Sequence, residues 1–195
     1  MASAPRRPRY FSGQLLTPED FEAEQSYHLE GRRRDTRHLH GWGVVSGLGV
    51  MPSSGGGVVV EPGLAIDGLG RAIVVPEPRE MADPRRPIDD RGAPCGPAVQ
   101  AGTVTLCLAY AERPDESDPD RFVRETYVIG VRHGRATPSG AHEPRDHRVA
   151  LATLDWRDGA IRVSLRPRRV LVSTHALLEL VDGLVRRVEA LEQRR

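Results

Sequence analysis

The sequence predicts a mainly β protein, an antiparallel β-barrel or sandwich flanked by an N-terminal helix and a C-terminal heptad helix. Short apolar runs separated by turn residues fill the middle of the chain, and helical spacing of apolar residues is found near its ends. The 20 glycines and 16 prolines among 195 residues also favour many turns over a helical bundle. We expect an arm and helix at residues 1–41, a β domain at 42–172 and an amphipathic or coiled-coil helix at 173–195.

The first helix is expected to run from Thr17 to about His38, after a basic arm that prolines interrupt. Thr17 can accept hydrogen bonds from the first free N–H groups, and Pro18 suits the first helical position. The acids at positions 19 and 20 complement the positive end of the helix. Its apolar face is thin, so the helix needs contacts with the rest of the fold or with a partner.

Short apolar runs predict the strands of the β domain, at residues 44–50, 58–60, 64–66, 72–75, 103–110 and 122–132. The three glycines at 55–57 are expected at a hairpin tip, and the Pro-, Arg- and Asp-rich residues 76–102 as a long exposed loop. A second loop is expected at 133–147. Asp158-Gly159 between two apolar runs predicts a further hairpin, which gives about eight strands in one barrel or sandwich.

The last helix carries apolar residues that step by four and three, which is the spacing of a heptad seam: Leu177, Val181, Leu184, Val188 and Leu191. Valine at the a positions and leucine at the d positions favours a two-stranded parallel coiled coil. However, Leu178, Leu180 and Val185 widen the apolar stripe beyond a strict two-stranded seam. Packing of this helix on its own β domain is therefore predicted equally well.

Charge and composition argue against several classes of protein, among them nucleic-acid binders and membrane-spanning proteins. All 28 basic residues are arginines and 27 residues are acidic, so the net charge is +1, which argues against a dedicated nucleic-acid binder. No run approaches the ~18 apolar residues of a membrane span, and the N-terminus lacks the apolar core of a secretory signal. We expect synthesis in the cytoplasm. Cys95 and Cys107 form neither a disulfide framework nor a metal knuckle.

The histidines do not predict a metal site or a catalytic site. His142 and His147 are five residues apart, whereas a helical zinc motif spaces its histidines by four, and Pro144 between them blocks a helix. His38 and His40 have no third ligand near them in the sequence. We therefore expect no catalytic residue, no cofactor and no metal, and no enzymatic activity.

The N-terminal third of the chain carries a specific pattern: R-Y-F-S-G-Q-L-L-T-P-E-D-F at residues 9–21, E-Q-S-Y-H-L at 24–29 and L-H-G-W-G-V-V-S-G-L at 39–48. This pattern resembles a family of small proteins encoded with bacterial contractile injection systems, the phage-tail-like particles. The similarity extends to residues 61–67, 70–71, 74–76 and 124–127. It implies a structural protein of the baseplate or fibres that is incorporated into the particle. Its partners would be baseplate, tube, sheath or fibre subunits.

The residues expected at interfaces with those partners lie in three places. Tyr, Phe and Arg are enriched at interface hot spots. We expect contacts from the arm, the first helix and the terminal seam, through Arg9, Tyr10, Phe11, Leu15, Leu16, Phe21, Arg32, Arg33, Arg34, Leu177, Val181, Leu184, Val188 and Leu191. The arginines at 32–34 and 166–169 are interpreted as solvated faces or ion pairs between subunits, because acids stand beside the first cluster.

A β-rich module that binds carbohydrate or another ligand, as a fibre tip does, is the alternative interpretation. It requires exposed aromatic residues on the β domain, where the available aromatics are Trp42, Tyr110, Phe122, Tyr127 and Trp156. Most of them lie in strand-like runs and are expected in the core. A hydrolase ranks third, because the sequence shows no convergent polar pocket.

Overall fold

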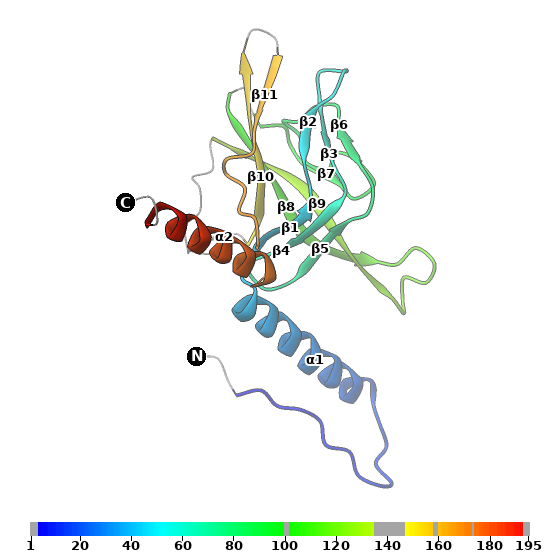
Figure 1. The fold of residues 1–195 in the computed structure, drawn as a ribbon. Helices are drawn as coiled ribbons and strands as arrows, with labels where there is room; N and C mark the ends of the chain where they lie inside the picture. The colour runs from blue at the N-terminus through cyan, green and yellow to red at the C-terminus, as the bar shows by residue number, and fades with distance from the viewer. Residues whose placement is uncertain (1–3, 100–101, 135–146, 158–159, 173, 193–195) are drawn as a thin grey trace.

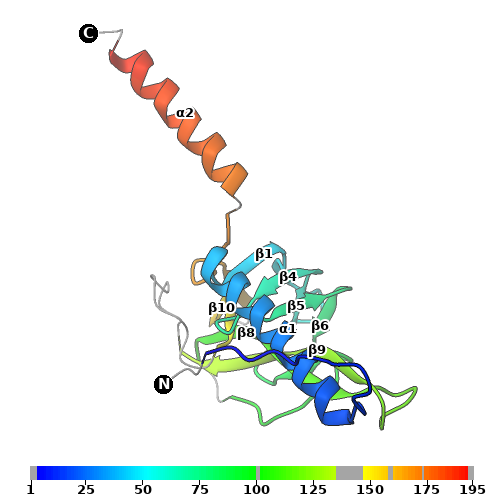
Figure 2. The same cartoon turned by 90° about the horizontal axis from the view of Figure 1, so that it is seen from below.

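The computed structural model describes residues 4–99, 102–134, 147–157, 160–172 and 174–192. Within these ranges the chain forms helix α1 (Pro18–Leu39), eleven strands and helix α2 (Thr174–Glu192). Figure 1 shows the strands gathered in one body, with α1 and the arm on one side of it. The view in Figure 2 shows α2 extending away from the strands.

The strands form three antiparallel sheets that pack as a sandwich, and within the described ranges no sheet closes into a barrel. The first sheet has the order β1 (Gly43–Gly47), β4 (Gly63–Ile66), β5 (Ala72–Val75). The largest has the order β11 (Ala160–Ser164), β10 (Val149–Arg157), β8 (Val104–Pro114), β9 (Val123–His133), β7 (Ile88–Asp89). The third has the order β2 (Val50–Pro52), β3 (Val58–Val60), β6 (Arg79–Met81). The prediction of a mainly β fold with a helix at each end is confirmed, as a sandwich-like arrangement.

One hydrophobic core lies between the sheets, and all three contribute to it. Its largest fully buried side chains include Leu48, Ile73, Met81, Leu106, Leu108, Ile129, Leu151 and Leu154. In β5 the side chains alternate between exposed and buried, as a strand with one face on the core requires. The core is almost entirely aliphatic, which agrees with the small aromatic content of the sequence.

Several local predictions are confirmed. α1 begins at Pro18, as predicted. At this start the carboxylate of Asp20 accepts a hydrogen bond from the Thr17 backbone N–H at 3.0 Å, so this contact comes from the acid and not from the Thr17 side chain. The hairpin at the glycine cluster joins β2 to β3, and the runs on either side of Asp158-Gly159 pair as β10 and β11. The turn residues 158–159 themselves lie outside the described ranges, as does most of the loop predicted at 133–147.

The prediction of one long exposed loop at residues 76–102 is wrong. This segment contains β6 and β7, which bury Met81 and Ile88 in the core. These strands are only three and two residues long and are surrounded by polar residues. Their burial comes from pairing with β3 and β9, which are distant in the sequence and leave no local pattern.

The predicted strands at 103–110 and 122–132 also extend further than expected. β8 and β9 have 11 residues each and pair along their whole length. Residues 111–114 belong to the strand although they are exposed or half-buried and include two charged residues, because this end of the hairpin projects beyond the core (Figure 1). A strand that meets solvent on both faces shows no apolar alternation.

The carboxylate of Asp67 is fully buried and organises the turn between β4 and β5. One oxygen, Oδ1, accepts hydrogen bonds from the backbone N–H groups of Leu69 and Arg71, both at 2.9 Å. The other, Oδ2, accepts a hydrogen bond from Arg71 Nε at 2.6 Å. A buried carboxylate is costly unless it is paired and hydrogen-bonded, and these three contacts supply that compensation.

We expect Asp67→Ala to lower the free energy of unfolding by about 3 kcal/mol, because it leaves two backbone donors and a guanidinium without their acceptor. Asp83→Ala is the matched control. The Asp83 carboxylate makes the same kind of contacts, with Arg85 N at 3.1 Å and Arg85 Nε at 2.9 Å, but in an exposed turn. Urea unfolding measures both losses, and equal losses in the two variants would contradict this role of Asp67.

Candidate interaction surfaces

The C-terminal half of α1 rests on the turn that Asp67 organises. Gly70 in this turn has φ +80°, and a Cβ atom there would overlap the carbonyl oxygen of Arg33 in α1. Only glycine allows both the left-handed backbone and this close approach. The turn therefore forms a seat for the helix.

The side chain of Tyr110 from β8 connects α1 to the same turn. The guanidinium carbon of Arg71 lies 4.4 Å from the centre of the Tyr110 ring, and that of Arg33 lies 5.9 Å from it. Tyr110 Oη donates a hydrogen bond to Glu112 Oε1 at 2.7 Å, and Glu112 lies 3.8 Å from the Arg33 guanidinium. Burial, together with the carboxylates of Glu112 and Glu125, raises the pKa of Tyr110, so its hydroxyl stays a donor.

Because of these contacts, the three arginines that were expected at an interface have different environments. Arg33 is half-buried and turns toward its own β domain. Arg32 and Arg34, its neighbours in the sequence, are exposed. A guanidinium that is exposed on the helix surface can form bidentate ion pairs with carboxylates of another protein.

The arm lies alongside the N-terminal part of α1 (Figure 1). Tyr10 Oη donates a hydrogen bond to Glu24 Oε2 at 3.0 Å, and a hollow of about 600 Å³ lies between arm and helix. No residue of α1 is buried. The predicted interface residues of this region are all exposed: Arg9, Tyr10, Phe11, Leu15, Leu16 and Phe21. The arm and α1 thus present aromatic and aliphatic side chains that their own fold leaves uncovered.

The segment before α2 is fixed to β1 by backbone hydrogen bonds. Val44 N donates to Arg169 O at 2.7 Å, and Leu171 N donates to Val44 O at 2.7 Å. The Arg169 guanidinium lies over the buried Trp42 at 4.8 Å, and Arg168 donates a hydrogen bond to Gly47 O. Burial also lowers the pKa of Arg168. Arg168 and Arg169 therefore contact their own domain, contrary to the interpretation of this cluster as a solvated face or a contact between subunits.

The seam side chains of α2 are exposed along the whole described helix. Their exposed fractions run from 47% for Leu177 to 65% for Leu191. Figure 2 shows the helix standing clear of the sheets. Of the two predictions for this helix, packing on its own β domain is not seen.

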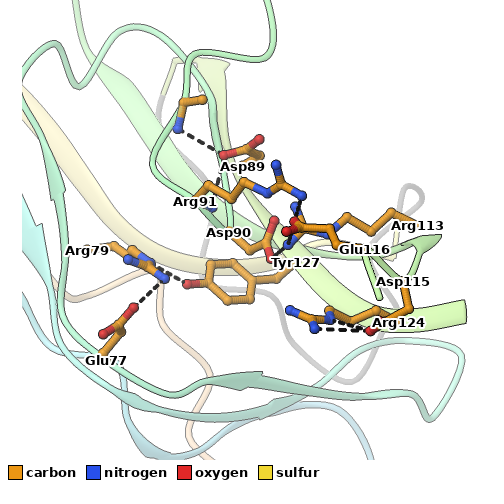
Figure 3. A network of polar contacts seen from close by, with 11 residues as sticks. Glu77, Arg79, Asp89, Asp90, Arg91, Arg113, Asp115, Glu116, Arg124 and Tyr127 are labelled. Carbon is orange, nitrogen blue, oxygen red and sulfur yellow. Dashed lines mark hydrogen bonds and ion pairs between the residues drawn. The ribbon is translucent and has the colours of Figure 1, made fainter. Parts of the chain in front are cut away.

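A network of arginines and carboxylates lines a hollow of about 690 Å³ between β9 and the segment around β7 (Figure 3). Arg79 Nε donates a hydrogen bond to Tyr127 Oη at 2.8 Å, and Arg113 pairs with Asp90 at 2.7 Å. Because each of these cations has its own partner, the hollow offers no concentrated positive charge to a ligand. The network joins the long hairpin to the rest of the fold.

The described residues offer little for metal chemistry. Within them, no three His, Cys, Asp or Glu side chains are arranged to hold a metal ion. His142 lies outside the described ranges. Cys107 is buried and Cys95 is exposed. Neither of the two helices, as far as they are described, combines the length and the apolar character that a membrane crossing requires.

Comparisons with known proteins find a likeness of fold. No family model and no curated protein sequence matches the chain. A crystal structure of TssK is similar with a TM-score of 0.42 and 12% identity, over 83% of this chain and 41% of the other. The cryo-electron microscopy structure of the type VI secretion system TssK-TssF-TssG baseplate subcomplex gives a TM-score of 0.46 and 13% identity, over 98% and 71%.

The chain thus spans about two fifths of the first of these structures. The second is a baseplate subcomplex by its own description. At these identities and scores the likeness carries no argument about partners or mechanism.

The seat of α1 was not predicted from the sequence. Aspartate followed three residues later by glycine, as at Asp67 and Gly70, is a turn signal that the sequence does show. The role of Tyr110 has no local signal, because the ring joins residues 33 and 71 only after β8 and the β4–β5 hairpin have come together.

We expect Gly70→Ala to loosen α1 from the β domain. Gly92→Ala is the matched control, because Gly92 has φ +83° and no atom within 4 Å of an added Cβ. Both variants lose about 1 kcal/mol for a left-handed alanine. Only Gly70→Ala should also speed amide hydrogen exchange in residues 30–39. Equal exchange in the two variants would contradict the proposed seat.

Asp115 near the tip of the hairpin gives a pH-dependent prediction. Hydrogen bonds from Ser117 and the guanidinium of Arg124, with Nε at 3.1 Å, lower the pKa of Asp115 to about 2. A lowered pKa stabilises the hairpin above about pH 3.9, the ordinary value, and this contribution is lost as the pH falls through about 2. An NMR titration should show this midpoint, and Arg124→Ala should raise it. Arg121→Ala is the control, and a midpoint near 4 in the unaltered protein would refute the assignment.

Proposed function

We propose that this chain is a structural assembly component of a contractile injection system or phage-tail-like particle, associated with its baseplate or fibres. It docks on a larger subunit through the arm and α1. The observation that carries the proposal is the group of exposed aromatic and aliphatic side chains in the arm and at the start of α1, a helix that buries none of its own residues. Groups of exposed apolar residues on a soluble domain mark interaction sites.

The energetics of α1 support a partner. A helix that buries nothing gains little from its own domain, and most helical stability in proteins comes from packing. Fully burying one large apolar side chain contributes about 1.5–3 kcal/mol. Burial of Phe11, Leu15, Leu16 and Phe21 against another protein would therefore favour association, against the entropic cost of binding.

The residues of the family pattern divide into two groups in the fold. Those at 43–48 and 61–67 form β1, β4 and the turn after β4, where Leu48 N donates to Pro62 O at 3.0 Å. Their presence is explained by packing. Those at 9–16 pack against little of the chain itself, with Phe11 71% exposed and Leu15 85% exposed. A docking surface accounts for this second group.

The ligand-binding alternative gains no support from the aromatic residues. Trp42 and Tyr127 are buried, and Tyr110 lies between two arginines. Trp156 is half-buried against the core. Phe122 is exposed near the hairpin tip with Arg121 beside it, which is too little for a stacking platform.

We expect deletion of residues 1–16 to leave a folded protein that no longer joins the particle. The described residues of the arm, 4–16, contribute nothing to the core, so the circular dichroism spectrum and the melting temperature should change little. Sedimentation of particles from cells that produce the shortened chain measures incorporation. Incorporation at the normal level would contradict docking through the arm.

A point substitution makes the same test without shortening the chain. Leu15→Asp places a charge in the proposed docking surface and should reduce incorporation at least tenfold. Leu39→Asp is the matched control, since Leu39 is 76% exposed at the other end of α1. If both variants are incorporated equally, the docking surface does not include residue 15.

A further inference from the structure

We propose that α2 pairs with α2 of a second copy of this chain, in parallel and in register. The seam is formed by Leu177, Val181, Leu184, Val188 and Leu191, and the register is set by Arg187 of one chain facing Glu192 of the other. This deepens the proposed assembly role but concerns a different surface from the arm.

Among the residues that the structure describes, none covers the apolar face of α2. The segment before α2 is fixed to β1 through Val44, so the helix starts at a defined place and points away from the sheets (Figure 2). All five seam residues are about half exposed or more. The outward b and f positions that are described carry Glu179, Asp182, Arg186 and Glu189. The polar face and the apolar face are therefore separate.

The exposed apolar face of α2 favours a partner. The helix has 19 residues and includes Gly183, which costs about 1 kcal/mol relative to alanine. Most of the stability of a helix in a protein comes from packing of its apolar face. Covering the seam on a second helix supplies the burial that its own sheets do not, and valine at a with leucine at d favours two chains.

The charges beside the seam select the parallel orientation. In a parallel pair, a residue at g faces the e position of the next heptad in the other helix. Arg187 at g then faces Glu192 at e, and Leu180 faces Val185, so both g–e pairs within α2 are complementary.

Antiparallel pairing lacks this complementarity. Aligning Val181 with Leu184 of the second copy places Arg187 beside Leu180. Moving the pairing by one heptad aligns Val181 with Leu191 of the second copy. Arg187 then lies beside Arg187 of the second copy. The first arrangement sets a charge against an apolar residue, and the second sets like charges together, which is destabilising.

A disulfide test distinguishes these orientations in the full-length chain. Leu191→Cys is introduced with Cys95→Ser, which removes the exposed native thiol. In a parallel pair the two residues at 191 are adjacent and should cross-link under mild oxidation. In the first antiparallel arrangement, residue 191 lies opposite residue 174, about 25 Å away along the helix at 1.5 Å per residue. Arg186→Cys, on the outward face, is the matched control and should not cross-link.

Sedimentation equilibrium of the full-length chain tests self-association and register together. We expect a mass of two chains, twice 21.5 kDa. Arg187→Glu and Glu192→Arg should each weaken association about tenfold, and the double variant should restore it. Arg186→Glu should have no such effect.

Three results would overturn the inference: a monomer at all concentrations, efficient cross-linking through residue 186 but not 191, or a double variant no tighter than the single ones. These measurements need no particle. Their failure would leave docking through the arm intact, and loss of docking would leave the coiled coil intact.

Discussion

The buried carboxylate of Asp67 is the constraint on which the placement of the candidate docking surface depends. Its three hydrogen bonds hold the turn after β4 in a shape that presents Gly70 to α1 and Arg71 to the face of Tyr110. A helix with no buried residue would otherwise have little reason to hold one position. The turn thus converts a polar, weakly amphipathic helix into a fixed support for the arm.

The two helices are attached to the β domain in different ways: α1 through a packing contact and α2 through the segment that precedes it. We assign them different roles for this reason. Only the C-terminal half of α1 rests on the β4–β5 turn. The N-terminal half of α1 and the arm, which carry part of the residue pattern of the family, stay exposed to solvent. α2 is attached through the segment before it, where Arg169 and Leu171 bond to the backbone of Val44 and Arg169 also lies over Trp42. In the assembly that we propose, the apolar surface of the arm meets a different protein, and the periodic seam of α2 meets a copy of itself.

Sequence analysis predicted the features that are encoded locally. The start of α1 at Pro18, the hairpin at the glycine cluster and the apolar runs of the core all depend on residues close together in the chain. β6 and β7 were not predicted, because two- and three-residue strands are defined by pairing with distant strands. The inward turn of Arg33 was not predicted for the same reason, since its partners Tyr110 and Glu112 come from β8. The heptad spacing identified the apolar face of α2 but did not say what covers it.

Amide hydrogen exchange of residues 9–29, measured in the free chain and in purified particles, tests the central claim most directly. If the arm and the N-terminal half of α1 dock on a larger subunit, these amides should exchange faster in the free chain than in the particle. The core strands β8 and β10 should exchange slowly in both states. Equal exchange of residues 9–29 in the two states would contradict the proposed assembly through this surface.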